Sequence, residues 1–322
     1  MASYVVRRLL QMVPTLAVIV VASFMLIKFI PGDPARTLAG EDADPATLAK
    51  VGAEYGFGQP LPEQLLHYSG RLLRGDLGES YSYAQPVTTV IRGALPATVL
   101  LTGTALVIST TVGIVLGMAA ARREQELADH IISGVTLVLF AIPGFWLAQL
   151  AILFPVLRWR LFPLQGMVDA SPTAPTGLGH LADIGYHLIL PAFVLAAAEV
   201  AAVARLVRSG LLSEGSRDYA RVAAAKGLDE EAVVAHHVLR NALLPVVTLV
   251  GTRIGFVLSG AVVIESIFSW PGLGSVLRSA LTTNLDPPLV LGIAVFTSVT
   301  VLAANLITDL AYTWVDPRVR LG

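Results

Sequence analysis

The sequence has no cysteine and little charge. Of its 322 residues only 14% are Asp, Glu, Lys or Arg, whereas an ordinary soluble domain has about 25%. The absence of cysteine excludes disulfide bonds, thiolate metal ligands and thiol catalysis. A formal net charge of -1 gives no general attraction for nucleic acid, so nucleic-acid binding is not expected. So few charges do not suit a water-exposed surface, and we expect lipid around most of the chain.

Hydrophobic residues make up 55% of the chain and are gathered in long blocks. The core of a bilayer needs about 20 apolar residues in a helix, because backbone groups in lipid must bond within the helix. Six tracts meet this requirement: residues 9–30, 94–120, 131–157, 187–207, 243–265 and 289–315. The sequence therefore predicts an all-α integral membrane protein with six transmembrane helices. The first tract is longer than the apolar part of a signal peptide, so we expect it to be retained.

Basic residues indicate the orientation of these helices. Most of them fall at the two ends and in one set of connections: Arg7, Arg8, Arg122, Arg123, Arg205, Arg208, Arg217, Arg221, Lys226, Arg240, Arg318 and Arg320. The short loops on the other side hold only Arg158, Arg160 and Arg278. By the positive-inside rule, both termini face the cytoplasm and the protein is a multi-pass component of the cytoplasmic (inner) membrane.

The predicted organisation has four parts. Residues 1–30 form the first transmembrane helix, and residues 31–93 form a small helical segment outside the membrane. Residues 94–315 form the transmembrane core, which includes a cytoplasmic connection at 208–242, and residues 316–322 form a cytoplasmic tail.

The external segment carries signals for two short helices. Asp44 followed by Pro45 is an N-cap with proline at the first helical position. Leu48, Val51 and Tyr55 then recur at helical spacing. After a breaker at residues 56–62, a second amphipathic stretch carries Leu65, Leu66, Leu72 and Leu73. We expect both helices to lie over the outer face of the membrane, packed against the protein itself or against a partner.

Small and helix-breaking residues mark the packing of the tracts. Small residues recur at every fourth position at Gly113 and Gly117, and again at Gly251, Gly255 and Ser259. This spacing lets two helix backbones approach closely, either within the chain or between membrane subunits. Pro143 and Gly144 interrupt the third tract and predict a kink there.

The cytoplasmic connection has the most informative local pattern. Residues 217–226 predict a short helix with Tyr219, Val222, Ala223 and Lys226 on one face, and Gly227 supplies its stop. Asp229 then caps a second helix that runs through Val233, Val234 and Leu239 towards the membrane. An alanine-rich helix can lie deep in the groove of another protein. The alternative is a solvated connection that only folds beneath the bundle.

The stretch from Asp218 to Pro245 resembles the EAA loop of ABC importer permeases. That loop has Glu-Ala-Ala, three residues, Gly, nine residues and then Ile-x-Leu-Pro. Aligned on Gly227, the opening falls on residues 221–223 and the closing quartet on residues 237–240. The chain departs from the pattern at the first Glu, at the Ile and at the final Pro.

Other segments match more closely the first permease subunit of dipeptide, oligopeptide and nickel importers. They are PGDPA from Pro31, GDLGES from Gly75, FAIPGFW from Phe140, DYARVAAAKGL from Asp218, LRNALLP from Leu239, ESIFSWPGLG from Glu265 and DPRVR from Asp316. The resemblance covers nearly the whole chain in the right order. It implies the type I ABC importer permease architecture and the import of di- or oligopeptides by alternating access.

The resemblance also implies partners: a second homologous permease, two cytoplasmic ATPases that bind ATP and Mg, and an external solute-binding protein. No GxxxxGK[ST] phosphate loop occurs in this chain, so no cofactor is expected on it and ATP energy must arrive through a partner. The residues implied to couple to the ATPase are Asp218, Tyr219, Arg221, Val222, Ala223, Ala224, Lys226, Gly227, Leu239 and Arg240.

Two further sets of residues are candidates. Glu199 and Arg253 are ionisable residues inside apolar tracts at comparable depth, where a charge is costly. They pair with each other, contact a zwitterionic peptide in the substrate path, or occupy separate solvated positions. At the outer end of the fifth tract, Glu265, Trp270, Pro271 and Gly272 form an interface anchor or turn, or a docking site for the solute-binding protein.

The remaining alternatives concern substrate and class. Nickel is the nearest alternative substrate, but a metal cavity would need histidines within the helices, and His187 sits only at a helix edge. An intramembrane protease is a remote alternative because HExxH and GxSxG are both absent. No catalytic residue and no metal ligand is therefore predicted. A purely structural membrane scaffold would lack the patterned cytoplasmic turn.

Overall fold

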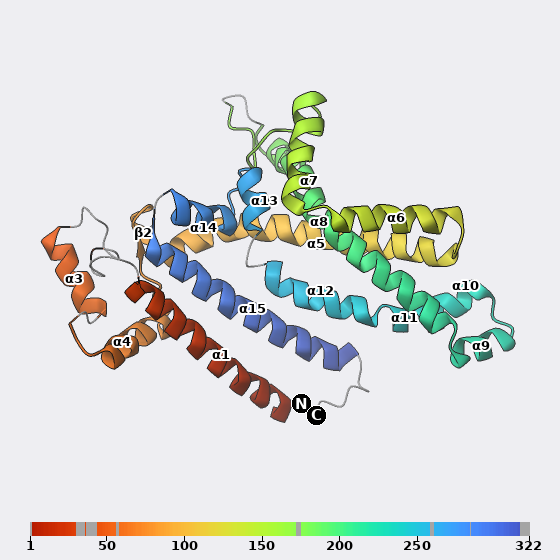
Figure 1. Cartoon of the computed structure of the whole chain (residues 1–322), viewed down its shortest axis with the longest axis horizontal. Coiled ribbons are helices and arrows are strands. Elements are labelled where there is room, and N and C mark those ends of the chain that lie inside the picture. The colour runs from red at the N-terminus through yellow and green to blue at the C-terminus, as the bar shows by residue number, and fades with distance from the viewer. Residues whose placement is uncertain are drawn as a thin grey trace. The chain divides into compact units, whose positions relative to one another are not determined.

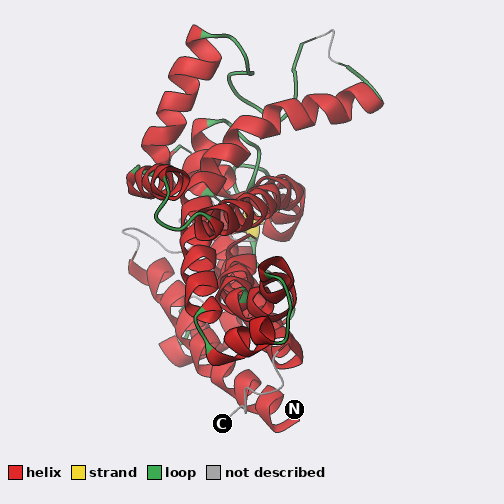
Figure 2. Ribbon diagram, turned by 90° about the vertical axis from the view of Figure 1, so that its right-hand side faces the viewer, coloured by secondary structure: helices red, strands yellow, loops and turns green. Residues whose placement is uncertain are grey.

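The computed structural model describes residues 2–29, 36, 44–55, 58–171, 175–257, 261–283 and 285–315. The PGDPA segment, Ser259 and the predicted tail 316–322 lie outside the described residues. The chain divides into two compact units: Met1–Ala97 with Pro271–Gly322, and Thr98–Trp270. Figure 2 shows that helices make up nearly all of the ribbon, as the sequence predicts.

The first unit is built on two long helices, α1 (Ala2–Phe29) and α15 (Pro287–Val315), which pack side by side (Figure 1). Helix α4 (Leu61–Leu73) packs on α1, where Phe24 lies buried with its ring centroid 6.1 Å from that of Tyr68. Leu291 of α15 joins the same apolar cluster. Helix α4 is thus fixed to the long helices of its own chain.

The two predicted external helices are both present. Helix α3 (Pro45–Tyr55) begins with a cap in which the Thr47 N–H donates to Asp44 Oδ1 at 2.8 Å, as expected. Hydrogen bonds from the side chain and the N–H of Thr47 lower the pKa of Asp44. In α4 the buried face carries Gln64 and Tyr68, whereas Leu66 and Leu73 are exposed. The leucine pattern therefore predicted the helix, and two of its four leucines, Leu65 and Leu72, pack against the cluster of Phe24 and Tyr68.

A short hairpin, which the sequence analysis did not predict, follows α4. Strand β1 (Glu79–Ser80) pairs antiparallel with β2 (Gln85–Pro86). It is held by Asp286, a fully buried carboxylate that accepts from Ser80 Oγ at 2.6 Å and from the Ser82 N–H at 3.1 Å. Asp286 also caps α15 by accepting from the Leu289 N–H at 3.1 Å. One side chain thus joins the hairpin to the last long helix.

The core of the first unit lies next to this hairpin. It is formed by the start of α5 (Val87–Arg122), by α14 (Leu273–Thr282) and by α15. Val87, Leu273 and Leu289 are fully buried there. Helix α5 begins well before the predicted tract 94–120, because its first turns are covered by protein.

The second unit contains the rest of α5, α6 (Leu127–Ala141), α7 (Gly144–Ala151), the π-helix η1 (Ile152–Arg158) and α8 (Leu178–Gly215). The predicted close approach at Gly113 and Gly117 is a contact within the chain. A Cβ added at Gly113 would lie 2.6 Å from Val203 Cβ, and one at Gly117 would lie 2.6 Å from the Ala204 carbonyl oxygen. Small residues on α5 therefore let α8 pack against its backbone.

The predicted kink in the third tract is confirmed and is larger than a simple bend. Ile142 is extended between α6 and α7, and Pro143 caps α7. The two helical arms meet at 100°. Proline cannot continue the hydrogen bonding of the preceding helix, which explains the break at this position.

The described residues contain three helices that are long and apolar enough to cross a membrane: Val87–Arg122, Leu178–Gly215 and Pro287–Thr308. Two bent pairs, Leu127–Ala141 with Gly144–Arg158 and Glu231–Ala242 with Leu244–Arg253, raise the count to five. The first predicted tract appears as a shorter apolar helix, Leu10–Leu26. Each of the six tracts thus falls on an apolar helical segment, and three to five of these segments qualify as spans.

Candidate functional site

The connection between the fourth and fifth predicted tracts folds as two helices around a glycine turn. Helix α9 (Asp218–Ala225) ends before Gly227, whose φ of 88° favours glycine because a side chain would be strained there. Asp229 then caps the next helix by accepting from the Ala232 N–H at 2.7 Å. That helix continues through α10 (Glu230–Val233), the π-helix η2 (Val234–Val238) and α11 (Leu239–Ala242). A bend of 42° leads into α12 (Leu244–Val257).

The inner face of α9 packs against its own chain. Ala220 and Ala223 are buried in a cluster with Val207 and Leu211 of α8 and with Val238. Helices α8 and α11 approach closely beside it, since a Cβ on Gly210 would lie 2.7 Å from the Ala242 carbonyl oxygen. The helical face predicted from sequence is therefore divided: Ala223 points inward, whereas Val222 and Lys226 are exposed.

The outer face of α9 and its turn expose both apolar and charged groups. We call this the coupling surface, after the role that the sequence predicts for this segment: Asp218, Arg221, Val222, Ala224, Lys226, Gly227 and Leu228, all exposed. Arg221 lies 3.8 Å from Asp218 in an ion pair that is open to solvent on both sides. Such a pair adds little stability. Arg240 is also exposed and Leu239 is half-buried.

Tyr219 ties α9 to the helices on either side of it. Its hydroxyl donates to Glu214 Oε2 of α8 at 2.8 Å and accepts from Asn241 Nδ2 of α11 at 3.3 Å. Burial, together with the hydrogen bond to Glu214, raises the pKa of Tyr219. Glu214 also pairs with Arg217 at 3.0 Å. Tyr219 therefore holds α9 against α8 and α11, and its predicted role in contacting the ATPase remains a prediction.

An ion pair with a buried carboxylate, which the sequence did not predict, fixes α6 to α8. Arg208 donates to both oxygens of Asp129, from Nε and from Nη2, each at 2.6 Å. The side chain of Asp129 is only 5% exposed and also accepts from the Gln125 N–H and from Ser133 Oγ. The available signal was an aspartate in the first turn of an apolar helix.

Glu199 of α8 and Arg253 of α12 form an ion pair. Arg253 Nη2 lies 2.8 Å from Glu199 Oε1, so the structure contains the first of the three predicted arrangements. The Glu199 side chain is 28% exposed and the Arg253 side chain is 42% exposed. They line a cavity of about 210 Å³ in the second unit. Their role in the substrate path remains a prediction.

The residues predicted for external docking are mostly buried. Glu265, in α13 (Val262–Ile267), is fully buried and its Oε1 accepts from Thr98 Oγ1 at 2.9 Å. Trp270 is also fully buried, and its N–H donates to the Glu265 carbonyl at 2.8 Å. Gly272 is buried and Pro271 is exposed. Glu265 and Trp270 thus stabilise a turn, and docking of a solute-binding protein at these four residues remains a prediction.

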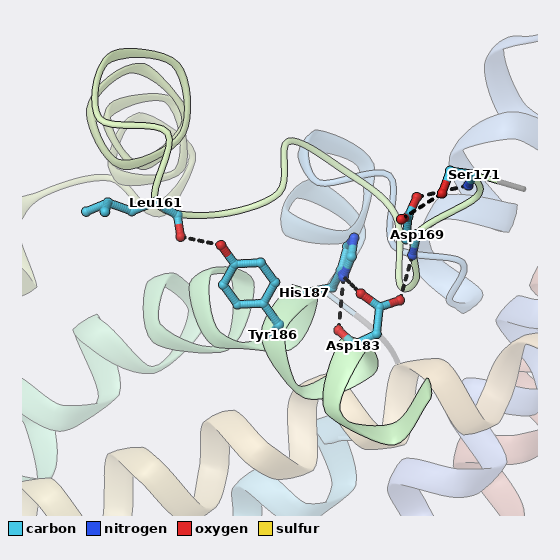
Figure 3. A network of polar contacts seen from close by, with 6 residues as sticks. All are labelled: Leu161, Asp169, Ser171, Asp183, Tyr186 and His187. Atoms are coloured by element: carbon cyan, nitrogen blue, oxygen red, sulfur yellow. Dashed lines mark hydrogen bonds and ion pairs between the residues drawn. The ribbon is translucent and has the colours of Figure 1, made fainter. Parts of the chain in front are cut away.

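His187, which the sequence predicted at a helix edge, lies inside α8, because that helix begins at Leu178, and it is held in a polar network (Figure 3). Its Nδ1 lies 3.2 Å from Asp183 Oδ1, and Asp183 Oδ2 accepts from the Asp169 N–H at 2.7 Å. The N–H and hydroxyl of Ser171 lower the pKa of Asp169. Tyr186 donates to the Leu161 carbonyl at 2.6 Å. Within the described residues no group of three His, Asp or Glu side chains could hold a metal ion.

Sequence families match both halves of the chain. Residues 113–321 match the family described as "Binding-protein-dependent transport system inner membrane component", and residues 1–102 match the N-terminal part of such components. Together these matches cover nearly the whole chain, and the first of them includes helices α9 to α11.

Several curated proteins are similar over their full length. The dipeptide transport system permease protein DppB of Escherichia coli strain K12 is 37% identical over 337 residues, with 99% of each chain covered. A putative peptide transport system permease protein of Brucella abortus strain 2308 is 38% identical over 320 residues, again with 99% of each covered. A probable peptide ABC transporter permease protein of Sinorhizobium fredii is 33% identical over 321 residues, with 99% of this chain and all of the other covered.

Solved structures share the fold. The inward-facing MetNI methionine ABC transporter matches 71% of this chain and 97% of its own, with a TM-score of 0.53 and 15% identity. The crystal structure of an amino acid ABC transporter with histidines matches 70% and 94%, with a TM-score of 0.51 and 16% identity. At such low identity these matches show the fold alone.

Proposed function

This chain belongs to the family of binding-protein-dependent transport system inner membrane components, and we propose that it is the permease subunit of an ATP-driven peptide importer. It is a multi-pass inner membrane component, and it is not itself catalytic. Membership of this family implies partners of two kinds, an ATPase and a binding protein. The full-length relatives named as dipeptide or peptide permeases support the choice of peptides as cargo.

The proposed assembly contains a second homologous permease, two cytoplasmic ATPases and an external solute-binding protein. ATP and Mg are bound by the ATPases, since this chain has no phosphate-binding loop. Both termini of this chain lie in the cytoplasm, which puts the coupling surface on the ATPase side. Nickel is the weaker alternative cargo, because the described residues offer no cluster of metal ligands.

The observation that carries the coupling role is the division of α9 into two faces. The buried alanines and Tyr219 attach α9 firmly to α8 and α11, while the coupling surface is open to a partner. A displacement of α9 is therefore passed to α8 and, through α11, to α12. Closure of the ATPase pair would move these helices and alternate access between the two sides of the membrane.

Replacement of Gly227 tests this role. Gly227→Val requires a β-branched residue at a φ of 88°, so the turn between α9 and α10 is distorted. In proteoliposomes that contain the assembly, ATP-driven uptake of a radiolabelled dipeptide should fall at least tenfold, while the ATPases still hydrolyse ATP. Tenfold corresponds to about 1.4 kcal/mol, within the cost of a strained backbone.

Gly215→Val is the matched control. Gly215 ends α8 close to the connection, has no positive φ and has open space around its Cα. This variant should retain uptake near the wild-type rate. Normal, ATP-coupled uptake by Gly227→Val would exclude the proposed role of the turn.

A further inference from the structure

The cavity beside Glu199 and Arg253 is bounded by α5, α8 and α12. Its walls are mainly apolar, with Leu106 of α5 and Leu195 of α8 among them. Two hydroxyl groups also line it, but both are used within the protein. Thr102 Oγ1 lies 2.7 Å from the Val257 carbonyl oxygen and Ser109 Oγ lies 3.0 Å from the Leu106 carbonyl oxygen. The polar chemistry that the cavity can offer a ligand is therefore one carboxylate and one guanidinium.

This pair differs from one that serves only to hold helices together. Both side chains are partly exposed, and they face an open volume rather than packed side chains. An ion pair with this much exposure contributes little to stability, so its exchange for another pair of opposite charges has a small cost. Ionisable residues within apolar membrane helices usually face a cavity that has a function.

Building on the proposed transport of peptides, we infer that this cavity binds the charged main chain of a short peptide. Glu199 receives the α-ammonium group, and Arg253 receives the carboxylate through a two-pronged hydrogen bond. A zwitterion brings one charge of each sign, so the cavity is electrically neutral before and after binding. No uncompensated charge is created at membrane depth during the exchange.

The size and charge of the cavity restrict its ligand. Pockets for drug-sized ligands measure about 300 to 1,000 Å³, whereas this one measures about 210 Å³. It therefore accommodates the main chain of a di- or tripeptide better than that of a longer peptide. A divalent metal ion needs several oxygen or nitrogen ligands, and here a guanidinium stands beside the single carboxylate. The site thus favours zwitterions over nickel.

The test combines changes in the peptide with changes in the protein. Uptake of dialanine, N-acetyl-dialanine and dialanine amide is measured in proteoliposomes that hold the complete assembly and a saturating amount of the binding protein. The variants are Glu199→Gln and Arg253→Gln. Comparing ratios between variants cancels the selectivity of the binding protein, because that protein is the same throughout.

Each variant should lose discrimination at one end of the peptide. The penalty for N-acetylation is the ratio of the uptake rate of dialanine to that of N-acetyl-dialanine, and the penalty for amidation is defined in the same way. The first should fall roughly tenfold to a hundredfold in Glu199→Gln, which is the range that one charge-assisted hydrogen bond supports, while the second remains. Arg253→Gln should show the reverse pattern. The controls are Glu126→Gln and Arg123→Gln, exposed residues at the turn between α5 and α6 that do not line the cavity. Both penalties should be unchanged in these controls.

The double variant Glu199→Gln/Arg253→Gln covers the case in which a single change leaves an uncompensated charge and prevents folding. It keeps the cavity neutral, and co-purification of the ATPases confirms that it folds. It should lose discrimination at both ends. Wild-type penalties in a folded double variant would overturn the inference. Failure of the wild-type assembly to take up dialanine with ATP would instead refute the proposed function.

Discussion

Helix α8 carries two arginine–carboxylate pairs that differ in their surroundings. Asp129 meets Arg208 through two hydrogen bonds of 2.6 Å, and its side chain is almost completely covered. Glu199 meets Arg253 at 2.8 Å, with both side chains open to a cavity. Asp129 also accepts from Gln125 and Ser133. The comparison indicates that the first pair is tied into the protein by a covered carboxylate, whereas the second faces a cavity that a ligand can enter.

The largest effect is expected from Asp129→Asn. The amide cannot accept from Arg208, Gln125 and Ser133 as the carboxylate does, and Arg208 is left with an unpaired charge. The midpoint of thermal unfolding of the purified assembly should fall by roughly 5 °C or more. In Glu199→Gln the midpoint should change little, although peptide uptake falls.

Differential scanning fluorimetry in detergent and uptake in proteoliposomes, applied to the same two preparations, separate the two effects. Equal loss of thermal stability in both variants would remove the distinction between the pairs.

A smaller and more specific effect is expected when the charges of each pair are exchanged. Glu199→Arg/Arg253→Glu keeps opposite charges in the cavity, and a zwitterion can bind in the reverse direction. Uptake should recover at least severalfold over either single variant. Asp129→Arg/Arg208→Asp should not recover stability, because arginine at position 129 has no acceptor for the Gln125 N–H.

The measurement is the initial rate of dipeptide uptake for the first exchange and the unfolding midpoint for the second. If uptake did not recover in Glu199→Arg/Arg253→Glu, direct pairing of opposite charges would not be the property of the cavity that supports uptake.

The smallest effect is expected at a third ion pair. Asp218 and Arg221 are 3.8 Å apart and both are exposed, so Asp218→Asn should leave the unfolding midpoint unchanged within error. Any loss should instead appear in the affinity between this chain and the ATPase, measured by titration of the ATPase against the reconstituted permease. A clear loss of thermal stability in this variant would show that the contributions of the three ion pairs to stability do not follow their solvent exposure.

The local parts of the molecule could be predicted from sequence. The caps at Asp44 and Asp229, the stop at Gly227 and the break at Pro143 each depend on a few neighbouring residues, and the structure contains all four. The close packing at Gly113 also agreed with its spacing in the sequence.

The remote contacts could not be predicted in the same way. Arg208 and Asp129 are 79 residues apart, and Ser80 and Asp286 are 206 apart, so no local pattern connects them. The prediction of which residues share the buried face of α9 was partly wrong for another reason. Alanine lies at 220 and at 223 to 225, so small apolar side chains surround the helix and give little contrast between its faces.

The boundaries of α8 differ from those of the predicted tract 187–207, because the prediction followed hydropathy. The apolar tract ends at residue 207, but the helix continues through polar residues to Gly215, next to the ion pair of Glu214 and Arg217. A helix needs hydrogen bonds along its backbone and not a continuous apolar surface, so its length exceeds that of the apolar tract.

The uninterrupted course of α8 from Leu178 to Gly215 has a geometric consequence. With a rise of 1.5 Å per residue, its 38 residues extend about 57 Å. A tilt of about 5° around one end would displace the other end by roughly 5 Å, close to one helical turn. A small angular change near Gly215 is thus amplified along the axis into a much larger displacement at Leu178, without unwinding of the helix.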